Sequence, residues 1–135
     1  MEINDVNSMS EKNYKKFYET EVWKEAFSLV QKIYTITKNY PKEERFGLTD
    51  QTRRSSNSVC ANIAEAHGRY YYADKIRVLY TVRGEIEETQ SHLMVAFSQK
   101  YIDETLLKET MGRYEKLKIR LNNQITDLHR QKGNE

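Results

Sequence analysis

The sequence has few residues that bend a chain and few that react. Its 135 residues include five glycines and one proline, so tight turns are scarce and the regular elements should be long. The single cysteine, Cys60, excludes an internal disulfide and a zinc site built from cysteines. We expect its thiol to be buried and inert, because its sequence neighbours are small and include no base.

Long hydrophobic runs and a large charge of one sign are also missing. No apolar run approaches the roughly 18 residues of a membrane span, and no stretch resembles a secretory signal peptide. We therefore expect a cytoplasmic protein that has no membrane partner. The 22 basic and 20 acidic side chains leave a formal net charge of +2. This balance neither requires nor excludes a nucleic-acid partner.

The sequence lacks the common catalytic motifs. It has no glycine-rich phosphate loop and no serine or cysteine nucleophile motif. Glu65 and His67 are two positions apart, so they point to different sides of a helix. Glu88 and His92 share a face, but a di-iron bundle needs a Glu-x-x-His motif on each of two helices. We expect no enzyme activity, no metal or other cofactor, and no small-molecule substrate.

The residues that are abundant indicate long amphipathic helices. Apolar residues make up 38% of the chain and charged residues 31%, a balance typical of helices with one buried stripe. Apolar steps of three and four predict four helices. Their expected ranges are residues 21–38, 49–67, 74–100 and 104 onward. Thr49 or Asp50 is predicted to cap the second helix.

The apolar stripes predict how these helices pack. The last helix has the most regular stripe, with steps of four and three from Leu107 to Leu128. Tyr34, Tyr80 and Tyr114 also fall on stripes, and we expect them in the core or at an interface. Short connections favour antiparallel neighbours. The sequence therefore predicts an all-α, antiparallel up-down four-helix bundle over residues 20–132, after a polar N-terminal tail over residues 1–19.

A polar seam follows one face of the second predicted helix, because its members are spaced by steps of four, four, three and four. One interpretation is a hydrogen-bonded network between helices, and the other is a ligand or RNA groove that uses the arginines. We favour the structural interpretation, with Glu85 and Glu88 of the next helix as complementary partners. The seam consists of Arg54, Ser58, Asn62, Glu65 and Arg69.

A second set of candidates combines aromatic and basic residues near the end of the same helix with two arginines near its start. Such residues suit stacking on single-stranded bases, and they equally suit subunit interfaces. We favour the interface. The residues proposed for either nucleic-acid or interface contacts are Arg53, Arg54, Arg69, Tyr70, Tyr71, Tyr72 and Lys75.

The stretch QTRRSSNSVCANIAEAHGR, residues 51–69, resembles the second helix of a bacterial four-helix bundle protein family first found in intervening sequences of 23S rRNA genes. The family pattern is Q-x-R-R-A-x-x-S-I-x-x-N-I-A-E-G. The resemblance extends over residues 22–128, through VWKEAFSLVQKIY, PKEERFGLTDQ and RGEIEETQSHLMVA. Ala66 and Glu85 depart from it, where the family has glycine and serine. The matching residues are Gln51, Arg53, Arg54, Ser58, Asn62, Ile63, Ala64 and Glu65.

The resemblance implies a homo-oligomer, commonly a pentamer with a central opening. A related branch comprises accessory proteins of diversity-generating retroelements, which bind a reverse transcriptase and nucleic acid. The function we expect is a non-enzymatic, homo-oligomeric helical bundle that associates with itself and acts as an assembly or scaffold module for an undefined partner. The alternative is an accessory protein that binds RNA or a ribonucleoprotein, associated with rRNA or a reverse transcriptase.

Overall fold

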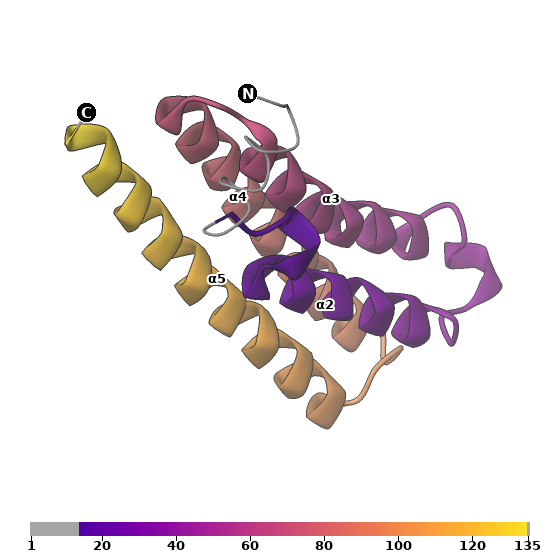
Figure 1. Cartoon of the computed structure of the whole chain (residues 1–135). Helices are drawn as coiled ribbons and strands as arrows, with labels where there is room; N and C mark the ends of the chain where they lie inside the picture. The colour runs from indigo at the N-terminus through magenta and orange to yellow at the C-terminus, as the bar shows by residue number, and fades with distance from the viewer. Residues whose placement is uncertain (1–13, 135) are drawn as a thin grey trace.

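A computed structural model describes residues 14–134, which fold into an all-α bundle (Figure 1). Within this range there is no strand, and two short 3-10 helices accompany four long α-helices. The 3-10 helices are η1 (Phe17–Glu19) and η2 (Lys42–Glu44). The α-helices are α2 (Glu21–Thr37), α3 (Leu48–Gly68), α4 (Tyr72–Ser98) and α5 (Glu104–Gly133).

The helices form an antiparallel, up-down four-helix bundle. Each packs against its neighbours in the chain, and α2 also packs against α5, which closes the square. Lys32 of α2 bonds to Glu109 of α5, whereas Glu25, earlier in α2, meets Arg113, later in α5. The bonds between α3 and α4 and between α4 and α5 reverse in the same way. The predicted fold is thus confirmed.

Two helices begin where a side chain accepts a hydrogen bond from the first turn. The Thr20 hydroxyl accepts from the amide of Trp23 at 3.3 Å before α2. The Asp103 carboxylate accepts from the amide of Leu106 at 2.8 Å before α5. These caps satisfy amides that have no partner inside the helix.

The start of α3 differs from the sequence prediction. The helix begins at Leu48, so Thr49 and Asp50 lie inside its first turn and neither caps it. Instead, Glu44 of η2 accepts a bond from the Leu48 amide at 3.2 Å. An added Cβ at Gly47, the N-cap, would lie 2.9 Å from that carboxylate oxygen. A side chain from the preceding turn replaces the expected local cap.

The core is formed by the inner faces of all four helices. The predicted stripe of α5 is buried, apart from the half-buried Met111. On α4, Tyr80, Met94 and Phe97 are 36–52% exposed, so Tyr80 does not lie in the core of the single chain. Val78 and Val82 are buried instead. α4 packs against both α3 and α5, so its buried face is wider than a single apolar stripe.

The predicted polar tail falls mainly on residues 1–13, which lie outside the described residues. Within the described part, η1 packs against both α2 and α3. Phe17 meets Trp23 edge-on, with ring centroids 5.4 Å apart. Residues 14–19 therefore contact the bundle. Among residues 14–134, no helix is both long and apolar enough to cross a membrane.

Candidate functional site

The residues proposed from the sequence lie in two separate regions of α3. Arg53 and Arg54 belong to its N-terminal part, beside α2. Arg69 follows its last residue and opens the connector to α4. At 1.5 Å per residue, the fifteen steps along the chain from Arg54 to Arg69 span about 22 Å. The structure therefore offers two candidate sites rather than one.

The polar seam is not continuous in its contacts. Asn62, near its middle, donates to both carboxylate oxygens of Glu85 on α4, at 2.9 and 3.1 Å. Ser58 lies beside the same carboxylate. Two members point outward, since Arg54 and Glu65 are exposed. Only the middle of the seam therefore joins α3 to α4.

The ends of the seam form ion pairs within or next to α3. Arg54 donates to Asp50 at 2.8 Å, with the arginine side chain 78% exposed. Glu65 pairs with Arg69, four residues later. Exposed pairs with this spacing stabilise a helix by only a few tenths of a kcal/mol.

Glu85 is the half-buried carboxylate on the α3–α4 boundary. Burial raises the pKa of Glu85, and the neighbouring charge of Glu88 raises it further. The hydrogen bonds from Asn62 and Ser58 oppose this increase in pKa. An amide and a hydroxyl thus bind a carboxylate at the position where the family resemblance has serine.

A fully buried set of hydroxyl groups, missed by the sequence analysis, lies next to this site. The Thr89 hydroxyl of α4 donates to Ser55 of α3 at 2.7 Å. Thr52 and Ser56 are also buried and donate to carbonyls of the preceding turn. The sequence signal for this set was a group of small hydroxyl residues at helical spacing. Such residues can be buried inside a helix, because Ser and Thr can donate their hydroxyl to a backbone carbonyl.

Arg53 joins α3 to α2 at the first candidate site. Its Nε donates to the Thr37 hydroxyl at 2.8 Å, and its guanidinium lies 4.6 Å from the centre of the Tyr34 ring. A surface pocket of about 320 Å³ lies here, lined by Tyr34, Asp50, Arg53, Arg54 and Asn57. Both arginines already have partners within the bundle.

An aromatic ridge, composed of Trp23, Phe27 and Tyr34, follows α2 beside this pocket. Trp23 and Phe27 stack with ring centroids 4.9 Å apart and an interplanar angle of 13°. Phe27 is 43% exposed and Tyr34 is 42% exposed. Of the two places expected for Tyr34, the core and an interface, its exposure excludes the core of the single chain. The apolar stripe of α2 is wider than the surface that α3 and α5 cover.

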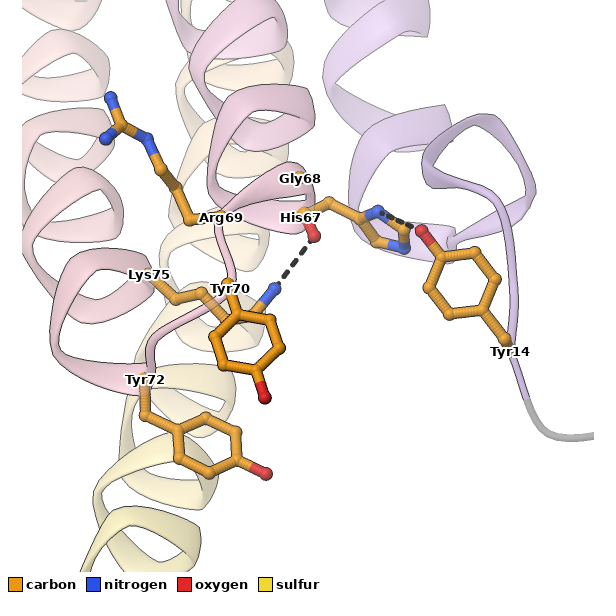
Figure 2. Close-up of a pocket in the computed structure, with 7 residues that line it drawn as sticks. All are labelled: Tyr14, His67, Gly68, Arg69, Tyr70, Tyr72 and Lys75. Atoms are coloured by element: carbon orange, nitrogen blue, oxygen red, sulfur yellow. Dashed lines mark hydrogen bonds between the residues drawn. The ribbon is translucent and has the colours of Figure 1, made fainter. Parts of the chain in front are cut away.

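The second candidate site is a connector pocket between α3 and α4, shown in Figure 2. It has a volume of about 480 Å³. Residues from the first described segment, the end of α3 and the start of α4 meet there. The structure brings together most of the aromatic and basic cluster but leaves out Arg53, Arg54 and Tyr71. Its lining consists of Tyr14, His67, Gly68, Arg69, Tyr70, Tyr72 and Lys75.

Hydrogen bonds fix two sides of the connector pocket. The Lys75 ammonium donates to the carbonyls of Ala66 and His67, at 3.2 and 2.8 Å. It thereby caps the C-terminus of α3, and burial lowers the pKa of Lys75. The His67 Nε2 lies 2.7 Å from the Lys15 carbonyl, which can only accept. In the neutral ring, Nδ1 therefore accepts from the Tyr14 hydroxyl, 3.4 Å away.

The tyrosines of the connector are largely open to solvent. Tyr70 is 86% exposed and Tyr71 is 67% exposed. Their rings meet edge to face, with centroids 5.1 Å apart and an interplanar angle of 85°. In such a contact the edge of one ring covers one face of the other, and the remaining ring faces are left open by it. Tyr72 is half-buried and packs against the core.

The groups considered for catalysis or metal binding are dispersed. His92 lies 3.9 Å from Glu88 as an isolated pair. Cys60 is buried, and burial raises its pKa to about 11, which disfavours the reactive thiolate. Among residues 14–134, no three His, Cys, Asp or Glu side chains gather to hold a metal ion.

Comparison with known proteins agrees with this architecture. The 23S rRNA-intervening sequence protein family matches residues 18–123. The chain belongs to this family. None of the curated proteins matches this chain. A similar fold occurs in a crystal structure of a protein of unknown function from the S23 ribosomal protein family of Bacteroides thetaiotaomicron VPI-5482. The TM-score is 0.72 at 24% identity, over 78% of this chain and 95% of that chain.

Proposed function

We propose that this family member is a non-enzymatic helical module that assembles with copies of itself. The single observation that carries the proposal is the aromatic ridge on α2. Phe27 and Tyr34 each leave more than 40% of their surface exposed, although both lie on an apolar stripe. Tyrosine, phenylalanine and arginine are enriched at protein interfaces, and Arg53 already lies over the Tyr34 ring.

The neighbouring surface of α3 favours close approach by another helix. Asn57 and Ala61 are exposed, and Ala64 is half-buried. These small side chains lie on or next to the face of α3 that carries Arg53, because they follow it at helical spacing. A projecting ridge beside a low surface is a shape that a second chain can complement. Burying one large apolar side chain contributes about 1.5–3 kcal/mol.

A second exposed apolar region supports a ring over a simple dimer. Tyr80, Met94 and Val95 of α4 are 45–52% exposed. Among the described helices, α4 does not pack against α2, so the two regions lie on helices at opposite corners of the bundle. Two different patches favour head-to-tail association, which closes into a ring when the rotation allows. The pentamer implied by the family resemblance is an arrangement of this kind.

The test introduces a charge into the ridge. We expect Phe27→Lys to lower the mass in sedimentation velocity to that of a monomer, because the ammonium would have to be buried. Ile119→Lys is the matched control, since Ile119 is an apolar residue of α5 that is 59% exposed and lies outside the ridge. A wild-type protein that is monomeric at micromolar concentration would refute the proposal. So would unchanged assembly of a folded Phe27→Lys variant.

The second candidate function, binding of RNA or a ribonucleoprotein, is supported by the exposed tyrosines of the connector. Arg53 and Arg54 support it less, because both are engaged by Thr37, Tyr34 and Asp50. We therefore expect their replacement by alanine to change the salt dependence of RNA binding only slightly. Filter binding over a range of salt concentrations measures that dependence.

A further inference from the structure

We propose that the connector pocket binds an unpaired nucleobase together with its phosphate. This inference deepens the second candidate function and does not depend on self-association. The ligand class has two sources, a single-stranded stretch of RNA and a free mononucleotide. The proposal rests on three features of the pocket: its aromatic walls, its charge and its fixed geometry.

Aromatic rings supply the first feature. In Figure 2, Tyr14 borders the pocket from the N-terminal segment, and Tyr70 and Tyr72 border it from the connector and α4. The volume of about 480 Å³ lies within the usual range for small-molecule sites. The 86% exposure of Tyr70 leaves its ring available to a ligand. Stacking on an aromatic side chain is the main way in which proteins hold unpaired bases.

The charge of the lining favours an anionic ligand. Arg69 and Lys75 line the pocket, and none of its lining residues within the described range 14–134 carries a carboxylate. The N-cap of α4 is Tyr71, whose side chain makes no capping bond. The first amides of α4 therefore add a partial positive charge. Asp74 lies in the same turn, but Arg77 is 3.7 Å from its carboxylate.

The positive charge of the pocket is moderate, which decides how much stacking and phosphate contact should each contribute to the affinity. Glu65 pairs with Arg69, and Lys75 is committed to the carbonyls at the end of α3. Stacking should therefore supply most of the affinity, with one phosphate held at the rim. The expected slope of log affinity against log salt is about −0.7, the value for a single contact to a single strand.

Internal bonds hold the pocket in shape before any ligand binds. Lys75 ties the first turn of α4 to the last turn of α3. His67 fixes the N-terminal segment through the Lys15 carbonyl and the Tyr14 hydroxyl. Walls that are already ordered lose less conformational freedom on binding. These contacts distinguish the pocket from a set of loose surface tyrosines.

The experiment measures binding of a labelled single-stranded RNA to the full chain by fluorescence anisotropy. An oligonucleotide of about ten residues covers one site, and salt of about 25 mM preserves the phosphate contact. Tyr70→Ala should weaken binding about 5- to 100-fold, the range for loss of one stacked base. Tyr70→Phe keeps the ring and should restore the affinity to within about twofold.

Tyr80→Ala is the matched control. Tyr80 is also an exposed tyrosine beside an arginine, with Arg83 5.5 Å from its ring, but it lies outside the pocket. Its replacement should leave RNA binding unchanged. Circular dichroism confirms that each variant is folded. Equal losses for Tyr70→Ala and Tyr80→Ala would overturn the proposal, because they would indicate non-specific contact with any exposed tyrosine.

Competition identifies the source of the base. If AMP or UMP displaces the labelled RNA at a concentration similar to that of the unlabelled oligonucleotide, the site takes free nucleotides. If only the oligonucleotide competes, the site takes single-stranded RNA. Either result supports the proposal. Equal binding of duplex RNA, or no detectable binding at low salt, overturns it.

The same samples separate this inference from self-association. Phe27→Lys alters the aromatic ridge on α2 and not the connector pocket. It should change the sedimenting mass while keeping RNA affinity, whereas Tyr70→Ala should do the reverse. A loss of RNA binding in the folded Phe27→Lys variant would contradict the independence of the two sites.

Discussion

The inner faces of α3 and α5 show how two helices of one bundle can contribute differently to its core. The buried residues of α3 include four hydroxyl side chains, Thr49, Thr52, Ser55 and Ser56. Those of α5 are large and apolar except for Thr110. Because small residues occupy α3, its neighbour α4 can approach closely enough for a direct bond between hydroxyl groups. α5 instead supplies bulk.

The two faces also differ in how their polar atoms are satisfied. The hydroxyl groups of Thr52, Ser55 and Ser56 all donate to backbone carbonyls. The hydroxyl of Tyr114 on α5 is buried and has no hydrogen-bond partner among the described residues. Paired groups specify how helices align, whereas an unpaired group costs free energy. We therefore expect mutations in the two faces to change the free energy of unfolding in different ways.

Leu117→Ala on α5 should have the largest effect. Leu117 is fully buried, so truncation removes apolar contacts and leaves a cavity. We expect the free energy of unfolding to fall by about 2–5 kcal/mol. Urea denaturation at one fixed protein concentration measures the change. A loss below about 1 kcal/mol would show that the core collapses around the site.

Thr89→Val on α4, at the contact with α3, should lower the free energy of unfolding by a smaller amount. The substitution preserves shape but removes the hydroxyl that donates to Ser55. Ser55 keeps its own bond to the Thr52 carbonyl at 3.2 Å, so no donor is left unpaired. We expect a loss of about 1 kcal/mol, measured by the same urea titration. The exposed Thr81→Val, also on α4, is the control and should change little.

Tyr114→Phe should raise the free energy of unfolding by about as much as Thr89→Val lowers it. Burial raises the pKa of Tyr114, which shows how strongly its environment disfavours charge. Removing the unpaired hydroxyl should increase the free energy of unfolding by about 1 kcal/mol. Thermal and urea unfolding both report this gain. A clear loss of stability would mean that the hydroxyl is hydrogen-bonded in solution.

The contrast between α3 and α5 also explains what could be predicted from the sequence. The heptad-like stripe of α5 identified its buried positions, because one continuous face meets the core. On α4, Tyr80 also falls on an apolar stripe but is 46% exposed, so spacing alone did not separate core from surface there. For α3, spacing placed Ser58 and Asn62 on a shared face. It did not reveal that Glu65 turns outward, because that depends on where α4 crosses.

The connector pocket was only partly accessible to sequence reasoning. Arg69, Tyr70, Tyr72 and Lys75 are close in the sequence, so their clustering followed from proximity. The contribution of Tyr14 did not, because it lies 53 residues from His67 and reaches it only in the folded chain. The division of the arginines into two sites follows from the length of α3 alone.

Glu85→Gln tests the polar boundary between α3 and α4 and should have the smallest effect. Because burial raises the pKa of Glu85, the folded protein binds a proton there more tightly than the unfolded chain. Stability should therefore fall as pH rises above the ordinary glutamate value of about 4.3. Glutamine stays neutral and can still accept from Asn62, so the variant should lose this dependence.

The measurement compares urea unfolding of both proteins from about pH 4 to about pH 7. As pH rises, we expect the free energy of unfolding of the variant to increase relative to that of the wild type by a few tenths of a kcal/mol. The change is small because a half-exposed carboxylate is screened by solvent. Glu43→Gln, at an exposed site in η2, should show no such trend. If instead the free energy of unfolding of the wild type increased relative to that of the Glu85→Gln variant as pH rose, the hydrogen bonds from Asn62 and Ser58 would stabilise the ionised carboxylate by more than burial destabilises it. The α3–α4 boundary would then depend on an ionised group, in contrast to the neutral hydroxyl bonds beside it.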